Sequence, residues 1–350
     1  MHDELPLPSH YEPDRVADVW RVDYERRFAD AVAWAARHGL APAASDEQAV
    51  CLLVVDGQNT FCTPGFELFV GGRSGVGALE DSRRLCAFVY RNLGLISQSV
   101  ATLDTHQAFQ IFHAPLLVGP DGRHPDPYTL VSTEDIASGR WRINASAAIA
   151  LGRDPEYIET HLSSYARALS ETGKYELTVW PFHALLGGIG HALVSAIEEA
   201  LFFHAIARTS PTVFEMKGDR PLTEHYSALG PEVLRDFTGS PLGSRNGRLI
   251  ERLLRHEAVI VAGQAKSHCV AWTVEDLLND PLVREHGLGD RLYLLEDCTS
   301  PVVVPGVIDY TEAADEAFAR FAARGAHVVR STDPVATWPG PISRAAATRA

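Results

Sequence analysis

The chain has 350 residues, of which 46% are hydrophobic and 22% charged, a composition that is typical of a globular protein and excludes disorder, collagen and coiled coil. Lys and Arg number 31 against 45 Asp and Glu, and the resulting net charge of −14 opposes binding to nucleic acid or to an anionic membrane surface. No apolar run reaches the roughly 18 residues of a membrane span, and the first residues lack the order of a signal peptide, so we expect a cytoplasmic protein without nucleic-acid or membrane partners.

Short β-branched runs alternate with amphipathic segments along the chain. The runs predict six strands, at 51–56, 99–104, 212–217, 258–263, 291–296 and 327–330. Apolar residues spaced three or four apart predict helices between them, at about 79–97, 246–256, 270–279 and 310–324. Since continuous apolar strands alternating with helices are typical of parallel sheets covered on both faces, we expect a three-layer α/β/α fold with a six-stranded, mainly parallel sheet.

Three segments lie outside this alternation. Residues 1–47 are expected to form an N-terminal helical extension, with one helix at about 14–38, before a main domain at 48–335. An insertion at about 114–179 opens with turn-forming residues and carries a helical pattern near 155–171, and another helix is expected near 191–208. The Pro- and Ala-containing end, 336–350, is expected to be a loose tail.

Residues with catalytic potential follow several of the predicted strands. In an open parallel sheet, ligands bind beyond the carboxyl ends of the strands, and Asp56, Lys217 and Cys269 fall there. The five cysteines are odd in number and scattered, which suits neither a disulfide framework nor a thiolate zinc site. An acid, a lysine and a lone cysteine suit acyl transfer, in which the thiolate attacks the substrate and the carboxylate carries the proton. The ammonium group and the helix start at Cys269 would lower the pKa of the thiol.

Each of these residues has an ordinary structural interpretation when taken alone. A strand-end Asp often caps a turn, a single Cys usually packs in the core, and a single Lys is usually solvated. Only the joint placement of the three residues favours chemistry.

A second group of side chains could hold a metal ion. Asp104 and His106 leave a predicted strand together, and His183 could add a third ligand, leaving an open site for Zn²⁺, Mn²⁺ or Fe²⁺. The spacing alone also allows these histidines to be ordinary surface residues. Other histidines compete for the role of ligand, namely His113, His124, His191 and His204.

Several motifs in chain order resemble those of the isochorismatase-like cysteine hydrolases. They are Asp56–Phe61 (Asp-Gly-Gln-Asn-Thr-Phe), Lys217-Gly218 followed by His225–Ala228, and Gly263–Val270 (Gly-Gln-Ala-Lys-Ser-His-Cys-Val). Asp104–His106 and Trp180–His183 resemble the metal-binding signature of the nicotinamidase branch. The resemblance runs from about 50 to 330, apart from the insertion.

The resemblance implies a role for each matching residue. Cys269 would be the nucleophile, Asp56 the proton acceptor and donor, and Lys217 the third member of a triad, in preference to Lys174, which lacks the preceding strand. The backbone N–H groups of Ala265 and Cys269 would form the oxyanion hole, with a cis peptide bond before Ala265.

The resemblance also assigns the metal ligands and the wall of the substrate pocket. Asp104, His106 and His183 would bind one divalent transition metal ion, with no organic cofactor. Phe61, Trp180 and Tyr226 would form an apolar wall for a flat ring.

The chain also departs from the pattern of nicotinamidases. Thr60 stands where a second acidic residue is usual, Ala184 stands in place of a cysteine, and the segment between His106 and His183 is unusually long. An insertion at that point should border the site, which weighs against nicotinamide itself.

From these features we expect an amidohydrolase that cleaves the C–N bond of a small carboxamide such as nicotinamide through a thioester. The alternative substrates are carbamoyl compounds, ureides and aliphatic amides, whereas isochorismatase chemistry does not need the thiol. Two other classes remain open, a non-catalytic binding protein on the same fold and a redox-sensing thiol at Cys269. The expected partner is a small-molecule amide, and the resemblance implies a homo-oligomer.

Overall fold

A computed structural model describes residues 4–172 and 175–348. The main sheet has six strands in the order β12-β9-β8-β1-β2-β7, and every neighbouring pair is parallel. The strands are β1 (Val50–Val55), β2 (Gln98–Asp104), β7 (Val213–Lys217), β8 (Ala258–Gly263), β9 (Leu292–Leu295) and β12 (His327–Val329). All six predicted strands are thus confirmed within one or two residues.

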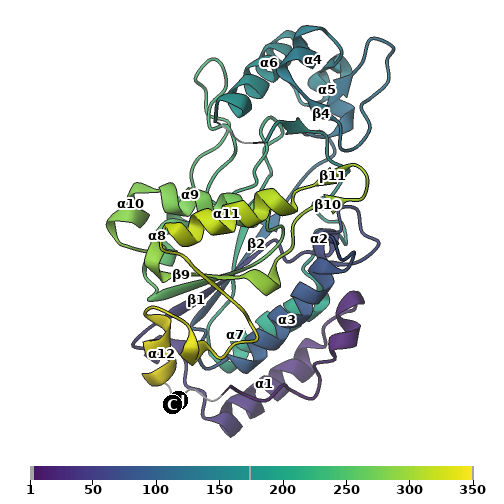
Figure 1. Cartoon of the computed structure of the whole chain (residues 1–350). Coiled ribbons are helices and arrows are strands. Elements are labelled where there is room, and N and C mark those ends of the chain that lie inside the picture. The colour runs from purple at the N-terminus through teal and green to yellow at the C-terminus, as the bar shows by residue number, and fades with distance from the viewer. Residues whose placement is uncertain (1–3, 173–174, 349–350) are drawn as a thin grey trace.

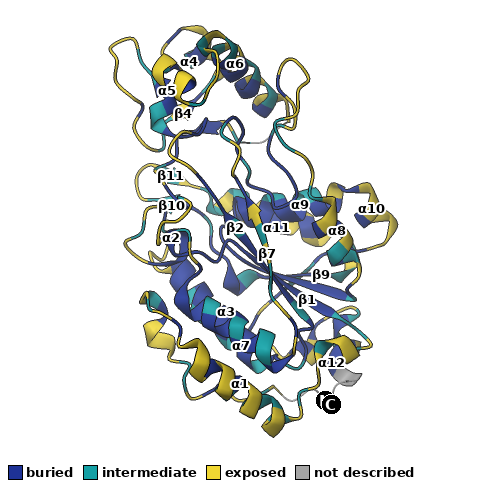
Figure 2. Cartoon of the chain, turned by 180° about the vertical axis from the view of Figure 1, so that it is seen from behind, coloured by how far each residue is buried: buried dark blue, intermediate teal, exposed yellow. Residues whose placement is uncertain are grey.

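Helices cover both faces of the sheet (Figure 1). On one face lie α3 (Gly77–Arg91) and α7 (Ser195–Ala207), with α1 (Tyr24–His38) packed outside α7, and on the other lie α8 (Gly247–Leu254), α9 (Cys269–Asn279) and α11 (Thr311–Ala323). Every residue of β1 and β8 is buried, as two-sided coverage requires (Figure 2). The three-layer α/β/α prediction is confirmed. Within the described ranges, no helix has the length and apolar character needed to cross a membrane.

The N-terminal helix is shorter than the sequence pattern predicts. Instead of beginning near residue 14, α1 begins at Tyr24, after a short 3₁₀ turn at Pro13–Ala17. The Asp23 side chain accepts a hydrogen bond from the Arg26 N–H, and this N-cap sets the start of the helix. Gly39, at φ +63°, ends it.

The insertion stands apart from the sheet, beyond the end of the molecule that carries α2 (Figures 1 and 2). It contains α4 (Thr133–Ala137), α5 (Ala145–Ala150) and α6 (Pro155–Thr172). Two short antiparallel pairs brace it, β3 (Leu117–Val118) with β5 (Arg142–Ile143) and β4 (Leu130–Val131) with β6 (Leu177–Thr178). The remaining short elements of the chain are α2 (Asn59–Cys62), α10 (Pro281–Glu285), β10 (Val303–Val304) and β11 (Ile308–Asp309).

The C-terminal segment packs on the core, in contrast to the loose tail expected at 336–350. Trp338 is 4% exposed and stacks on Phe88 and Tyr293, each at a ring-centroid distance of 5.8 Å. Ile342 is fully buried at the start of α12 (Ile342–Thr348). The prolines that suggested a loose end therefore lie between two apolar anchors, whose burial holds the segment.

Candidate active site

The proposed catalytic side chains meet at the carboxyl edge of the sheet. Asp56 directly follows β1, Lys217 ends β7, and Cys269 begins α9 shortly after β8. The Lys217 Nζ lies 2.9 Å from Asp56 Oδ2 and 3.5 Å from Cys269 Sγ. It also lies 2.8 Å from Asp104 Oδ1. All four residues are at least nine-tenths buried, so one ammonium group links the acid, the thiol and a second acid away from water.

Asp56 is held by β2 as well as by its own strand. Its backbone has φ +45°, in the left-handed region that non-glycine residues rarely adopt. The Thr102 hydroxyl donates to Asp56 Oδ1 at 2.5 Å and accepts the Asp56 N–H at 2.9 Å. Thr102, which the sequence patterns did not single out, therefore fixes both the backbone and the carboxylate of Asp56.

The buried charges of the group shift one another's protonation. Burial opposes the charged form of Lys217, but Asp104 and Asp56 outweigh it and raise the pKa of Lys217 well above its usual value. Burial raises the pKa of Asp56, and Lys217 only partly offsets this. The Asp56 carboxylate is consequently a stronger base than an exposed one.

The thiol differs from its expected state. Burial raises the pKa of Cys269 well above its usual value; Lys217 lowers it, while Asp56 and Asp104 raise it further. The lowered thiol pKa that we expected from the lysine and the helix start is wrong, because the sequence patterns do not reveal the desolvation of a side chain that is 7% exposed. A protonated, buried thiol also counts against a redox sensor, which needs an accessible thiolate.

The segment before Cys269 offers two unused donors. The Gln264–Ala265 peptide bond is cis, as the resemblance implies. Within the described ranges, neither the Ala265 N–H nor the Cys269 N–H donates a backbone hydrogen bond. Both groups are free to bind an anionic oxygen next to the Cys269 sulfur.

The three proposed metal ligands also meet. Asp104 Oδ2 lies 2.7 Å from His106 Nε2 and 3.5 Å from His183 Nε2. Each imidazole has its Nδ1 against a backbone carbonyl, that of Gly218 at 3.0 Å and that of Pro181 at 2.8 Å. With those Nδ1 atoms protonated, both Nε2 lone pairs face the same carboxylate, an arrangement that a divalent cation would satisfy. The donor set therefore fits a metal ion.

Gly218 allows the close approach of these ligands. It has φ +87°, and a Cβ at this position would lie 2.6 Å from His106 Cε1 and 2.8 Å from Asp104 Oδ1. A side chain there would displace both ligands. Burial raises the pKa of Asp104 by itself, but His106 and Lys217 outweigh burial and hold the pKa well below its usual value, so this carboxylate is charged.

Of the competing histidines, His113 and His191 lie near the cluster, and His113 has its ring against those of two ligands. Its ring centroid is 6.0 Å from that of His106 and 5.9 Å from that of His183, its Nδ1 lies 3.0 Å from the Gln107 carbonyl, and among described residues its Nε2 has no partner. The predicted ligand set does not include His113, because its position in the sequence is out of register with the Asp104–His106 motif. His191 Nε2 is hydrogen-bonded to the Thr105 hydroxyl between two of the ligands. The other two are bound elsewhere, His124 on the Leu117 carbonyl and His204 on Ile96 and Ser99.

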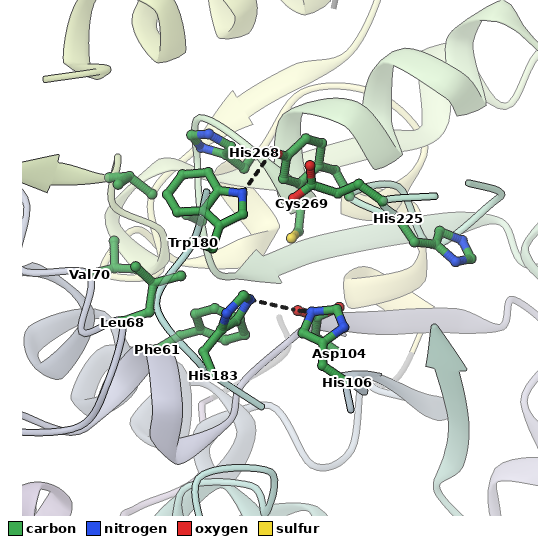
Figure 3. Close-up of a pocket in the computed structure, with 14 residues that line it drawn as sticks. Phe61, Leu68, Val70, Asp104, His106, Trp180, His183, His225, His268 and Cys269 are labelled. Carbon is green, nitrogen blue, oxygen red and sulfur yellow. Dashed lines mark hydrogen bonds and ion pairs between the residues drawn. The ribbon is translucent and has the colours of Figure 1, made fainter. Parts of the chain in front are cut away.

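A pocket joins the triad to the metal cluster (Figure 3). About 430 Å³ of space not filled by atoms, open solvent at its mouth included, lies between the lining residues, and the Cys269 sulfur points into it. All three predicted wall residues line it, Phe61, Trp180 and Tyr226, and the Trp180 Nε1 donates to the Tyr226 hydroxyl at 3.0 Å. The patterns gave no pocket role to two polar lining residues, Glu224, which lies just before the His225–Ala228 motif, and His268, which lies within the Gly263–Val270 motif. The rival Lys174 lies outside the described residues.

Comparisons with known proteins agree with this architecture. No family model and no curated protein matches the sequence. Among solved structures, yeast nicotinamidase bound to the inhibitor nicotinaldehyde matches at 19% identity over 80% of this chain and 99% of that chain, with a TM-score of 0.50. This match shows that the chain has the isochorismatase-like α/β fold.

Two other matches have lower TM-scores. An Acinetobacter baumanii nicotinamidase pyrazinamidase matches at 20% identity, over 83% of this chain and 99% of that one, with a TM-score of 0.48. The N-carbamoylsarcosine amidase of Thermoplasma acidophilum matches at 16% identity, over 82% of this chain and 98% of that one, with a TM-score of 0.39.

Proposed function

We propose that the protein is an amidohydrolase that acts on non-peptide C–N bonds through Cys269, Asp56 and Lys217. The observation that carries this proposal is the position of Lys217 Nζ, 2.9 Å from the Asp56 carboxylate and 3.5 Å from the only cysteine sulfur that lines the described pocket. A charged ammonium buried between an acid and a thiol has little structural benefit, because desolvation opposes it. It is well suited to stabilising the anionic states of acyl transfer.

The resting protonation states suggest the order of events. Asp56 takes the proton of the Cys269 thiol as the sulfur attacks the carboxamide carbon, and the N–H groups of Ala265 and Cys269 receive the anionic oxygen. Asp56 then gives the proton to the leaving nitrogen, the C–N bond breaks, and a thioester remains on Cys269. Water, deprotonated by Asp56, attacks the thioester carbon, the C–S bond breaks, the acid is released, and Asp56 returns the proton to the Cys269 sulfur. Lys217 stays protonated throughout and balances the charges of Asp56 and Asp104.

An aromatic carboxamide such as nicotinamide is the first substrate class to test. The ring would lie against Phe61, Trp180 and Tyr226, which line the pocket beside the sulfur. Asp104, His106 and His183 would hold one divalent transition metal ion. The ion would hold a ring nitrogen of the substrate either directly or through a water molecule. A carbamoyl compound is the alternative.

A panel of amides with ammonia release as the readout tests the proposal. We expect turnover of at least one aromatic or carbamoyl amide, and a mass increase on Cys269 equal to the acyl group when the reaction is quenched. Cys269→Ala should abolish both signals, whereas the matched controls Cys62→Ala and Cys86→Ala, which alter cysteines that do not line the pocket, should retain them. Turnover by Cys269→Ala at the wild-type rate would refute the mechanism.

A further inference from the structure

Glu224 is a buried acid in the pocket that the proposed mechanism does not use. It lies in the segment between β7 and α8, is 5% exposed, and lines the same pocket as Cys269. Among the described residues, no Lys or Arg forms an ion pair with it. A carboxyl group in such a place is costly unless it has a task, since burial without a counter-charge disfavours its ionised form.

The neighbours of Glu224 present it to the pocket as an acceptor. Its backbone N–H donates to the Tyr165 hydroxyl of α6 at 2.9 Å, which fixes the segment against the insertion. Its carboxyl group lies within reach of the Tyr226 hydroxyl, which accepts the Trp180 Nε1–H at 3.0 Å, and both aromatic residues line the pocket. The polar atoms of Trp180 and Tyr226 and the Glu224 carboxyl group thus lie together at one side of the pocket.

Burial and two acidic neighbours act on the Glu224 carboxyl group. Burial raises the pKa of Glu224 well above its usual value; Tyr226 and Trp180 lower it, and Glu232 and Asp104 raise it further. Burial and Glu224 likewise raise the pKa of the Tyr226 hydroxyl. A cation placed beside the Glu224 carboxyl group would offset the burial that disfavours its ionised form, and the neighbouring aromatic rings of Trp180 and Tyr226 would also favour a cation.

We propose that Glu224, Trp180 and Tyr226 form a subsite for an ammonium group on the acyl part of the substrate, so that the enzyme prefers amides that also carry an amine. The inference rests on the proposed function only in taking the ligand to be an amide. On binding, the ammonium group supplies the counter-charge that Glu224 lacks among the described residues, and the carboxyl group loses its proton to solvent. An acyl part that carries a carboxylate would be repelled.

Calorimetric binding of two isosteric probes tests the subsite without any hydrolysis. Benzylamine is a cation at pH 7.5 and benzyl alcohol is neutral, and each is titrated into the full-length protein in two buffers of different ionisation enthalpy. We expect benzylamine to bind about 10-fold more tightly or better, as a hydrogen bond to a charged partner allows, with release of a proton. Glu224→Gln keeps the size and an acceptor oxygen but cannot ionise, and it should abolish both the preference and the proton release.

Two results would overturn the subsite. One is equal binding of the two probes, and the other is a preference that persists in Glu224→Gln, which would assign the amine to the metal ligands. Because neither result depends on turnover, failure of the amidase proposal would be seen separately in the amide panel.

The same variant distinguishes specificity from positioning. For an active enzyme, Glu224→Gln should lower kcat/KM for 4-(aminomethyl)benzamide at least 10-fold relative to 4-(hydroxymethyl)benzamide. An equal loss for both amides would show that Glu224 only positions Trp180 and Tyr226, and the subsite would be rejected.

Discussion

Replacing Thr102 by valine should shift the pH dependence of the enzyme. Valine has nearly the shape of threonine but removes the hydroxyl that donates to Asp56 Oδ1 at 2.5 Å and accepts the Asp56 N–H at 2.9 Å. Thr102 is fully buried on β2, so water cannot replace the lost group without a rearrangement. The variant tests whether Asp56 is the proton acceptor without changing the acid itself.

The size of the shift follows from the two lost hydrogen bonds. A hydrogen bond to a charged group contributes about 1.5–3 kcal/mol. Since the Thr102 hydroxyl favours the ionised carboxylate, its loss should raise the pKa of Asp56 by about 1–2 units at 1.36 kcal/mol per unit. The unpaired N–H of Asp56 should add a cost of about 1–3 kcal/mol to folding.

The assay is the pH profile of kcat/KM, which reports the groups of the free enzyme. Asp56 must be ionised to accept the thiol proton, so raising its pKa should move the acid limb upward by about 1–2 pH units. Thr102→Ser retains the hydroxyl and should leave the limb near its wild-type position. A Thr102→Val enzyme that unfolds at lower urea concentration but keeps the wild-type acid limb would refute the assignment of Asp56.

Two further predictions concern the metal ligands and the insertion. Elemental analysis should find about one transition ion per chain. His183→Ala should lose this ion while remaining folded by circular dichroism, whereas the exposed control His124→Ala should keep it. Retention of the ion by His183→Ala would show that the ligand set is wrong. Replacing residues 120–172 with a short Gly/Ser linker removes the Tyr165 hydroxyl that binds the Glu224 N–H. The substrate profile should therefore change while Cys269 still forms an acyl adduct. An unchanged substrate profile together with an unchanged sedimentation coefficient would contradict a functional role of the insertion.

The sheet and the residues at its edge were predictable because their signals are local. β1 and β8 are buried on both faces, so their sequences are continuous apolar runs that only a covered parallel strand explains. Asp56, Lys217 and Asp104 follow from the same logic, since the carboxyl ends of parallel strands lie together.

What the sequence patterns missed depends on contacts between distant segments. Trp338 is held by stacking on Phe88 and Tyr293, so the prolines near it misled the prediction of a loose tail. The raised pKa of Cys269 follows from burial in a pocket lined by residues distant in sequence, such as Phe61 and Trp180. His113 lies out of register with the other ligands, and its place at the cluster depends on the path of the 107–113 loop.

The insertion supports the wall of the pocket and leaves the catalytic edge of the sheet to the strands. On α6, the Tyr165 hydroxyl holds the Glu224 N–H at 2.9 Å, and His161 Nε2 lies 2.8 Å from the Leu222 carbonyl. Tyr165 is 1% exposed, so its ring packs inside the protein and only its hydroxyl serves the Glu224 segment. Because the proposed triad lies at the edge of the sheet while Glu224 is held by α6, changes in the insertion should alter substrate choice without disturbing the proposed chemistry. This separation explains why motifs at the strand ends resemble a known family while the substrate has to be inferred from the loop that the insertion supports.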